Sequence, residues 1–400
     1  SAVSVWESGL PFEATTTYNS VNGWDTGEII IDSTGMKGIG KTGSDSNIVW
    51  IVELDEREEQ DGGGDADPGT FYTFTNCGKE GRSGPNQDQV NATYNVENNT
   101  LNGGVTITTP GIQEWIVPAD GTYSIEAWGA AGGTQLYQND YPGGYGAKII
   151  GSFTLTEDDV LKIIVGQKGE DTRTSVQCPT HCDNAAPGGG GGTYVWNGVN
   201  NTLLIAAGGG GGGFRFSHNG VHANFNTSGN AANSLSNGGT GGNGGLPNTG
   251  NYSYWAGGGA GWIKDGTGGN NETAHSYTPG VRGAHGGRRP LNGGLGGERW
   301  IDNQYLDEGG DGGFGGGGGG GSDNMGAGGG GGYSGGGGSK IFTGNPPPYD
   351  GWIGSTGGGG GSYCGDQDGG ECVANVNATG DGGTWELNEG HGKVIITVMD

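Results

Sequence analysis

The segments GGDGGFGGGGGGG (309–321) and GAGGGGGYSGGGG (326–338) decide what kind of fold this chain can form. Glycine supplies 100 of the 400 residues and comes in such blocks. Proline supplies only 14, so the chain lacks the proline-rich three-residue repeat of collagen. Interior glycine costs a helix about 1 kcal/mol, which excludes a helix-rich protein. The 11 Trp, 15 Tyr and 9 Phe argue against a disordered chain, because disordered chains are poor in aromatic residues.

Glycine blocks offer backbone groups and no side chains. Backbone N–H and C=O groups need hydrogen-bond partners, and an extended threefold helix makes no such bonds internally. Because only glycine lets backbones approach closely, threefold helices packed side by side can bond to one another. We therefore predict a bundle of polyglycine-II helices over residues 208–383. Aromatic residues set among the blocks are expected to cap or flank it: Phe214, Phe216, Trp255, Trp262, Trp300, Phe314 and Tyr333.

Much of the remaining chain has a β pattern. Runs of β-branched and aromatic residues bounded by Gly, Pro, Asn and Asp predict strands. These runs cover 71–75, 105–109, 112–117, 122–129, 147–155, 160–167, 193–196, 202–208 and 392–399. The last run needs a partner from before the glycine blocks. The sequence thus predicts an all-β fold, a jelly roll formed by 71–207 and 384–400 with 208–383 inserted.

Residues 1–70 form a separate region in this prediction. Short β-patterned runs cover 2–6, 28–32 and 47–54, and an acidic, glycine-broken linker follows at 55–68. One of these runs is a candidate assembly strand. GMKGIGKT (35–42) matches the phosphate-binding loop pattern, but a further strand pattern follows it where the motif needs a helix. Nucleotide binding is therefore not predicted.

The charge balance limits the partners. Lys plus Arg number 17 and Asp plus Glu number 43, which gives a net charge of −26. Such a charge repels phosphate backbones and anionic membrane surfaces, so we expect no nucleic-acid partner. No apolar run approaches the roughly 18 residues of a membrane-spanning helix, so no membrane span is expected. We expect a secreted, extracellular protein whose signal peptide has been removed.

Seven glycosylation sequons and the cysteine spacing favour secretion. The acceptors are Asn91, Asn98, Asn200, Asn226, Asn251, Asn271 and Asn377, which predicts covalent glycans. Two close cysteine pairs suit small disulfide loops, and they are Cys178 with Cys182 and Cys364 with Cys372. Cys77 is left over and is either unpaired or intermolecular.

No catalytic constellation is recognisable, so we do not expect an enzyme. GYSGG (332–336) matches a nucleophile-elbow pattern but lies between glycine blocks. No cofactor is expected apart from calcium, for which Asp61, Asp65 and Asp67 are the candidate ligands because they gather oxygens in one loop. A solvated acidic loop explains the same residues.

An ordered set of segments resembles a known family. They are TNCGKEGRSGPNQDQVNATY (75–94), GIQEWIVPADGTYSIEAWGAAGG (111–133), VLKIIVGQKGED (160–171), GGGGGTYVW (188–196), LLIAAGGGGG (203–212) and EGHGKVIITV (389–398). In order and spacing, across about residues 71–400, they resemble the extracellular glycine-rich domain of the anaplastic lymphoma kinase and leukocyte tyrosine kinase receptors. The resemblance implies a jelly roll, similar to tumour necrosis factor, that carries an inserted bundle of polyglycine helices. Val90 stands where the family pattern has a second cysteine, and the family's transmembrane helix, EGF-like cysteine cluster and kinase have no counterpart here.

Two functions remain open from the sequence. The first is a secreted structural or adhesive glycoprotein that is not catalytic and assembles with its own copies, as a homo-oligomer, filament or surface matrix. A run such as SAVSVW (1–6) would add as a strand to a neighbour's sheet edge. The alternative is a soluble extracellular binding module for a polypeptide or polysaccharide, in which Trp255, Trp262 and Trp352 stack on sugars.

Overall fold

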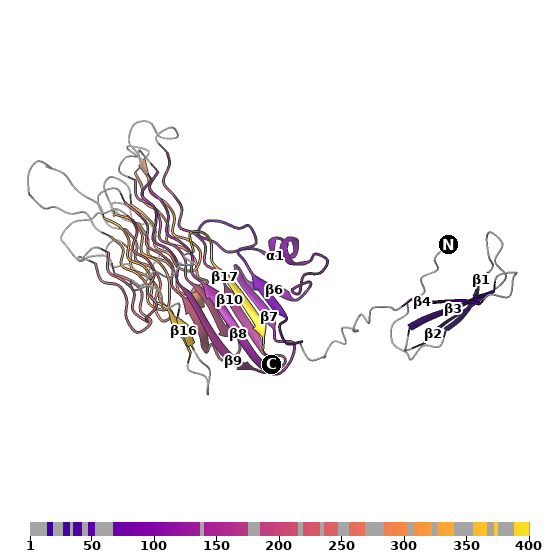
Figure 1. The fold of residues 1–400 in the computed structure, drawn as a ribbon. Helices are drawn as coiled ribbons and strands as arrows, with labels where there is room; N and C mark the ends of the chain where they lie inside the picture. The colour runs from indigo at the N-terminus through magenta and orange to yellow at the C-terminus, as the bar shows by residue number, and fades with distance from the viewer. Residues whose placement is uncertain are drawn as a thin grey trace, which may run out of the picture. The chain divides into compact units, whose positions relative to one another are not determined.

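The structure, a computed structural model, divides the chain into two compact units, Ser1–Gly64 and Asp65–Asp400 (Figure 1). The described residues are 14–18, 27–32, 35–41, 47–52, 67–136, 140–174, 185–214, 219–232, 236–246, 256–268, 284–302, 307–321, 326–339, 355–365, 372–374 and 388–399. In the four N-terminal ranges, and in 301–302, 307–308 and 372–374, the description covers the backbone alone.

The described part of the N-terminal unit is one antiparallel sheet with the strand order β1-β2-β3-β4. Its strands are Ala14–Tyr18, Gly27–Asp32, Gly35–Lys41 and Asn47–Val52. β2 and β4 confirm two of the predicted runs, whereas the sequence does not predict β1 and β3. β3 occupies the match to the phosphate-binding pattern, so those residues extend as a strand instead of curling around an anion.

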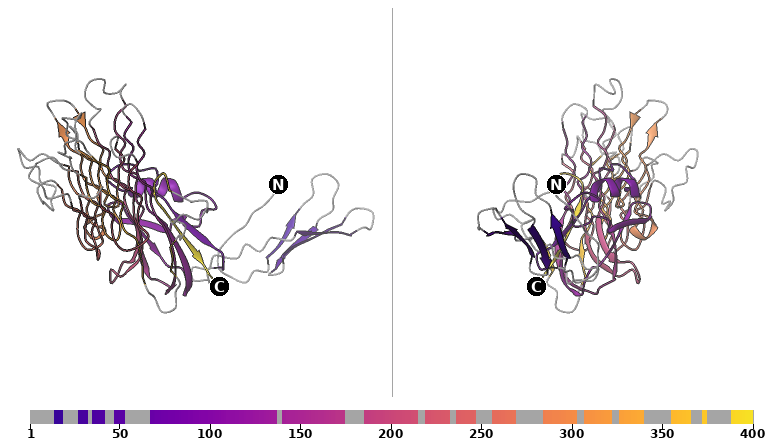
Figure 2. Two further views of the ribbon diagram at one scale, coloured as in Figure 1. Left: turned by 60° about the vertical axis from the view of Figure 1, so that its left-hand side comes forward. Right: turned by 90° about the vertical axis from the view of Figure 1, so that its right-hand side faces the viewer.

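The second unit contains two large antiparallel sheets (Figures 1 and 2). The five-stranded sheet has the order β16-β9-β8-β17-β5, formed by Cys372–Ala374, Lys148–Leu155, Gly121–Trp128, Lys393–Val398 and Phe71–Phe74. The six-stranded sheet has the order β15-β12-β11-β10-β7-β6, formed by Tyr363–Cys364, Leu203–Ala207, Thr193–Asn197, Val160–Ile164, Ile112–Ile116 and Val105–Thr109. A small pair, β13 (Ile301–Asp302) and β14 (Asp307–Glu308), stands apart. The sheet-rich structure agrees with the predicted all-β class.

One hydrophobic core lies between the two large sheets. Both contribute buried side chains to it, including Tyr123 and Ile396 from the five-stranded sheet and Leu161 and Val195 from the six-stranded sheet. In β17, which reads KVIITV, alternate residues are buried, as expected of a strand with one face in the core. This C-terminal strand pairs with β8 on one side and β5 on the other, so the chain does return to the sheet after the glycine blocks.

A short helix, α1 (Gln87–Tyr94), interrupts the strand order, and the sequence analysis does not predict it. Asn86 caps the helix: its side chain accepts from the Gln89 N–H (2.9 Å), and the Gln89 side chain accepts from the Asn86 N–H (3.1 Å). This reciprocal capping box starts the helix. Val90 and Tyr94, four residues apart, lie on its buried face.

The glycine-rich segments bond to one another with a period of three residues. In 188–192, every third N–H donates to the same neighbouring segment, and the residues between them donate to other segments. The bonds run from Gly188 to Glu170 (3.1 Å), Gly189 to Gly318 (2.9 Å), Gly190 to Gly210 (2.8 Å), Gly191 to Gln167 (2.9 Å) and Gly192 to Gly315 (2.9 Å). Figures 1 and 2 show these segments running side by side without strand arrows. We call the set of segments bonded in this way the glycine lattice.

Close approach explains why glycine is needed in the lattice. A Cβ atom placed on Gly191 would overlap the carbonyl oxygen of Phe314, and one on Gly188 would overlap that of Asp311. Both obstacles are backbone atoms, which cannot rotate away as a side chain can. The lattice thus depends on the absence of side chains, not on their packing.

A second hydrophobic cluster joins the lattice to the six-stranded sheet. The outward side chains Tyr194, Trp196 and Leu203 are buried together with Phe314, and Trp262 and Tyr333 pack against them. The Trp262 ring lies 5.7 Å from the Trp196 ring in an edge-to-face arrangement. These aromatic residues flank the lattice, as the sequence predicts for Trp262, Phe314 and Tyr333. Phe216 and Trp255 lie outside the described residues.

The lattice includes segments that precede the predicted insertion. Residues 129–133, which follow β8, and 187–192, which precede β11, take part in the same hydrogen bonding as 208–213. The division into 1–70, 71–207, 208–383 and 384–400 therefore stays a prediction from the sequence. Individual strands run directly into lattice segments.

Candidate functional site

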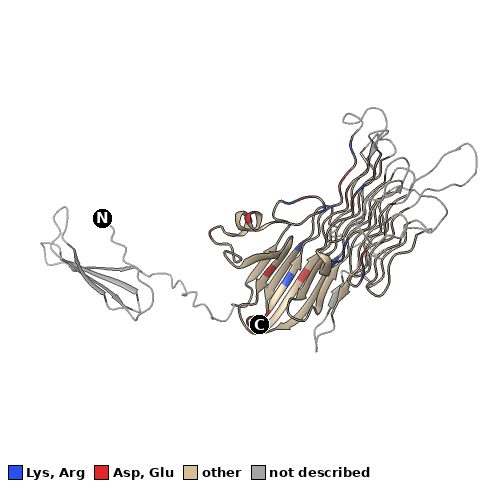
Figure 3. Cartoon of the chain, turned by 180° about the vertical axis from the view of Figure 1, so that it is seen from behind, with Lys and Arg blue, Asp and Glu red and all other residues tan. Residues whose placement is uncertain are grey.

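A charged pocket lies where lattice segments meet the turn that follows β5. It has a volume of about 630 Å³ and draws its lining from several separate parts of the chain. The lining residues are Lys79, Glu80, Gly81, Arg82, Ser83, Lys168, Gly169, Glu170, Asp171, Arg299, Asp311 and His391. Four of the chain's 17 Lys and Arg residues gather here, whereas Figure 3 shows the lattice segments largely without charge.

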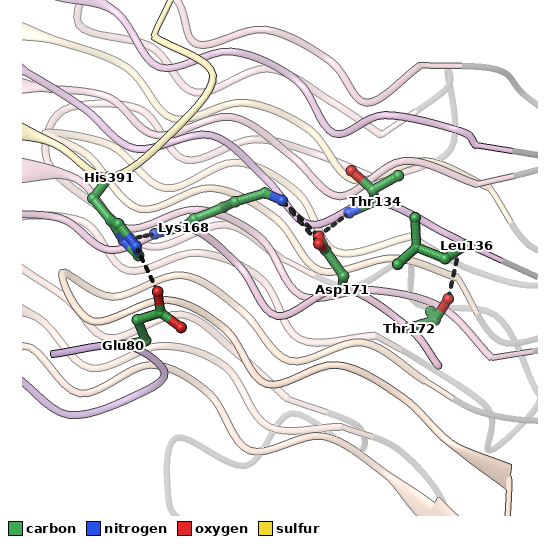
Figure 4. A network of polar contacts seen from close by, with 7 residues as sticks. All are labelled: Glu80, Thr134, Leu136, Lys168, Asp171, Thr172 and His391. Carbon is green, nitrogen blue, oxygen red and sulfur yellow. Dashed lines mark hydrogen bonds and ion pairs between the residues drawn. The ribbon is translucent and has the colours of Figure 1, made fainter. Parts of the chain in front are cut away.

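A series of polar contacts connects the pocket to the lattice (Figure 4). The residues drawn are Glu80, Thr134, Leu136, Lys168, Asp171, Thr172 and His391. The Nδ1 atom of His391 accepts from the Lys168 N–H (3.1 Å), and its Nε2 atom lies 3.4 Å from Glu80 Oε1. Because Nδ1 accepts, the proton of a neutral ring is on Nε2, which faces the carboxylate. His391 thereby ties the start of β17 to the segment that follows β10.

The other carboxylates of the pocket also have partners. Asp171 Oδ1 lies 2.8 Å from Lys168 Nζ and accepts from the Thr134 N–H at 2.7 Å. Arg299 Nη1 lies 3.0 Å from each carboxylate oxygen of Glu170. These pairs are partly exposed, so each contributes little to stability, but together they fix the ends of lattice segments.

Arg82, Lys168 and Arg299 each form an ion pair, whereas the Lys79 ammonium group forms none with the described residues. The pocket can therefore hold an anionic group against Lys79. Within the described part of the chain, no group of three or more His, Cys, Asp and Glu side chains is placed to hold a metal ion.

Sequence reasoning does not single out this pocket. Lys79 and Arg82 follow Cys77 closely, but Lys168, Arg299 and His391 come from distant positions with no motif spacing. The sole sequence signal is the gathering of basic residues in CGKEGR (77–82), in a chain that is otherwise acidic.

The edge strand β6 is covered by one side chain. Gln87 Nε2 donates to the Val105 carbonyl (3.1 Å), and the Ile107 N–H donates to Gln87 Oε1 (2.7 Å). The Gln87 amide thus bonds to β6 through both a donor and an acceptor, as a neighbouring strand would. Such cover keeps an edge from pairing with other chains.

The edge strand β5 is covered at its two ends. The Thr100 hydroxyl donates to the Phe71 carbonyl (2.8 Å). The N–H of Thr75, just after the strand, donates to the Tyr94 hydroxyl (2.8 Å). Both covering residues belong to α1 or to the turn behind it, so the helix that the sequence analysis misses helps to close two sheet edges.

Four predicted glycosylation sites lie on the described surface. Asn91, Asn98, Asn200 and Asn226 are all exposed, and Asn91 lies on α1. Asn251, Asn271 and Asn377 lie outside the described residues. Attachment of glycans at any of these positions stays a prediction.

The cysteines separate into a buried thiol and a disulfide. Cys77 is free and only 6% exposed, and burial raises the pKa of its thiol. Cys364 is disulfide-bonded. Its sulfur lies beside Gly151, and Gly151 pairs across the sheet with Cys372, so the predicted partner is close at hand. Cys178 and Cys182 lie outside the described residues.

The remaining candidates give little support to a ligand site. Trp262 is packed against the second hydrophobic cluster, and Trp255 and Trp352 lie outside the described residues. Of the calcium candidates, Asp67 is exposed, whereas Asp61 and Asp65 lie outside the described residues.

Comparison with known proteins shows a similarity over part of the chain. No protein-family model matches the chain. Among the described residues, no helix is long and apolar enough to cross a membrane. The chain is similar to part of the leukocyte tyrosine kinase receptor of Mus musculus, with 37% identity over 100 residues that cover 25% of this chain and 11% of the receptor.

Proposed function

We propose that this protein is an extracellular structural glycoprotein that is not catalytic and assembles with its own copies into a filament or a surface matrix. Its second unit would be a jelly roll similar to tumour necrosis factor, and the glycine lattice would be a bundle of polyglycine-II helices. Residues from the N-terminal region would join one copy to the next by strand addition.

The main support for a structural role is the three-residue period of the lattice hydrogen bonds. A threefold helix directs successive N–H groups about 120° apart, so each of its faces meets one neighbour at every third residue. Segments 188–192 and 328–331 bond in this way. A block held by backbone bonds in several directions is stiff, which suits a structural unit.

The partial receptor similarity supports the extracellular and non-catalytic parts of the proposal. The matched segment is a small fraction of that receptor, so its signalling and partners do not follow for this chain. The exposed sequons agree with a secreted glycoprotein but are equally compatible with an unmodified surface.

Electron microscopy and sedimentation of the purified full chain test the proposal directly. We expect concentration-dependent filaments or sheets, and loss of these on deletion of residues 1–13, which leaves β1 intact. Intact-mass measurement before and after glycosidase treatment tests the glycans. A full-length chain that stays monomeric at every concentration would refute the self-assembly.

A second candidate is a binding module, which the charged pocket favours. Lys79 would contact an acidic peptide or an acidic polysaccharide in that pocket. Lys79→Ala should then weaken binding of an acidic polysaccharide at least 10-fold, whereas Lys264→Ala, at an exposed site away from the pocket, should not. No saturable binding to the unchanged chain would exclude this candidate.

A further inference from the structure

The N-terminal sheet ends, among its described strands, in an apolar edge strand. β4 reads NIVWIV (47–52), with no charged residue and no proline, and among the described strands it has β3 as its one neighbour. Edge strands usually carry a charge, a proline, a bulge or a cover, because a bare edge pairs with other chains. β5 and β6 have side-chain cover. The other edge of this sheet, β1 (ATTTY), also has no charge and no proline, but β4 is longer and more apolar and is therefore the better suited of the two to receive another strand.

The register of this sheet separates its charged residues from an uncharged face. All four charged residues of the strands fall on one face, and they are Glu28, Asp32, Lys37 and Lys41. On the opposite face, residues paired across the four strands include one set of Ala14, Ile31, Met36 and Val52 and a second set of Thr16, Ile29, Gly38 and Trp50. A further strand paired with β4 would add main-chain hydrogen bonds and cross-strand neighbours to this single layer of four strands.

We propose that residues 1–6 (SAVSVW) of a second copy add to the outer edge of β4 as an antiparallel strand. This inference rests on the self-assembly proposed above and names its acceptor. SAVSVW has no charge and no proline. Val3 and Val5 share one side of an extended strand, with Ala2, Ser4 and Trp6 on the other. Main-chain hydrogen bonds supply affinity, and the uncharged side chains match an uncharged edge.

The strand order makes the same contact difficult within one chain. An antiparallel strand beside β4 would run in the same direction as β1. Because β1 begins at Ala14, the last residue of the added strand would lie at the other end of the sheet from Ala14. The way back crosses four strand spacings, about 19 Å, and the length of the strand, about 17 Å, so the straight diagonal is about 25 Å. Residues 7–13 span at most about 26–29 Å, and only when fully extended. A second copy meets no such limit.

Each copy then carries one donor strand and one acceptor edge, at different places on the molecule. Such a heterologous contact repeats from copy to copy and forms an open filament unless the rotation closes a ring.

The first experiment places a proline at consecutive positions of β4. Val49→Pro and Trp50→Pro remove N–H groups that point to opposite sides of the strand, so one affects the outer edge and the other the pairing with β3. Thr15→Pro and Thr16→Pro in β1, the opposite edge strand, are matched controls. We expect the edge-directed β4 variant to raise the concentration needed for assembly at least 10-fold, and the edge-directed β1 variant to leave it unchanged.

A second measurement keeps the test decisive if a proline variant fails to fold. Val5→Cys is combined in turn with Ile48→Cys, Val49→Cys and Trp50→Cys in the full chain, and intermolecular disulfides are sought under mild oxidation. We expect cross-linked ladders for at least one pair. A pair of Val5→Cys with Thr16→Cys should give none.

The outcomes separate this inference from the proposed function. If deletion of residues 1–13 abolishes assembly but the folded β4 variants assemble normally and no cysteine pair cross-links, the acceptor lies elsewhere and the inference fails alone. If the unchanged chain never assembles, both fail. If assembly survives the deletion, the donor is wrong and the inference is again overturned.

Discussion

Strand β12 and the six glycines that follow it are one continuous stretch of chain that is held in two different ways. Leu203–Ala207 is buried along its whole length and pairs with β11 and β15 in the plane of a sheet. Residues 208–213 follow directly and bond to several segments in turn. Their bonds run from Gly209 to Gly331, Gly210 to Ala130, Gly211 to Val221, Gly212 to Gly328 and Gly213 to Gly133.

The difference shows what side chains do to an extended backbone. In β12 they occupy both faces, so hydrogen bonds run only to the left and right, and burial of apolar surface stabilises the strand at roughly 25 cal/mol per Å². Without side chains, backbone neighbours approach from every direction. Each net hydrogen bond then contributes only about 0.5–1.5 kcal/mol, but no glycine N–H from 209 to 213 is left without a partner.

The largest effect should come from adding a single methyl group to the lattice. A Cβ at Gly210 would overlap the carbonyl oxygen of Gly144. We expect Gly210→Ala to cost at least about 5 kcal/mol, enough to prevent folding of a marginally stable unit. Gly390→Ala is the matched control, because the nearest atom to its Cβ would be Asn388 Oδ1 at 3.9 Å. Equal stability of the two variants in chemical denaturation would contradict the close-approach account.

Removing side-chain volume from β12 should have a smaller but clear effect. Ile205 is fully buried in the shared core. Ile205→Ala should lower the free energy of unfolding by about 2–5 kcal/mol, because it removes apolar contacts and leaves a cavity. Denaturation followed by tryptophan fluorescence measures it. Val199→Ala, at a side chain that is 79% exposed, should change little.

Tyr194 belongs to β11 of the six-stranded sheet, and its hydroxyl bonds to the glycine lattice. Its replacement therefore tests how one such contact contributes to stability, and how that contribution changes at high pH. Its hydroxyl donates to the Gly332 carbonyl (3.0 Å), so Tyr194→Phe should cost about 1–3 kcal/mol. Burial raises the pKa of Tyr194 well above its ordinary value of 10.0. Above pH 10 the unfolded chain therefore loses a proton that the folded chain keeps, and stability falls as pH rises. Tyr194→Phe should reduce that slope in denaturation series from pH 8 to 11, and an unchanged slope would contradict the assignment.

The smallest effect concerns His222, which holds one lattice segment to another. Its Nδ1 atom accepts from the Tyr145 N–H (2.9 Å), and partial desolvation of the ring, which stacks on Tyr145 but stays exposed to solvent, lowers its pKa from the ordinary value of 6.5. Below pH 6.5 the unfolded chain binds a proton that the folded chain resists, so stability should fall as pH drops. His222→Asn retains an acceptor and should flatten thermal midpoints between pH 7 and 5. If the unchanged chain shows no decline there, His222 does not couple protonation to folding.

The helix α1 shows why part of the fold could not be read from composition. Its start is encoded locally, because Asn86 and Gln89 have capping-box spacing, yet the short stretch QDQVNATY carries little hydrophobic pattern. Its role in covering β6 depends on Gln87 reaching Val105 and Ile107. The sequence contains no pattern that places the Gln87 amide at a sheet edge.

The charged pocket could not be predicted from the sequence for a similar reason. Ion pairs need only proximity, and they leave no spacing in the sequence when partners such as Arg299 and Glu170 lie far apart along the chain. Strands are different: in β17 the alternation of KVIITV records which face is buried, so the run at 392–399 was recognisable in advance.

The sequence is enough to predict that the chain is strand-rich, where most strands of the second unit lie, and that glycine blocks must find partners through their backbones. Alternating burial and obligatory backbone bonding are local properties that a sequence records directly. Tertiary structure alone decided which glycine segments meet, that 129–133 and 187–192 join the lattice, and which side chains cover the edges of β5 and β6. Glycine residues are alike, so their order in the chain cannot specify their neighbours. Those are set by the sheets and aromatic residues that fix where each segment begins.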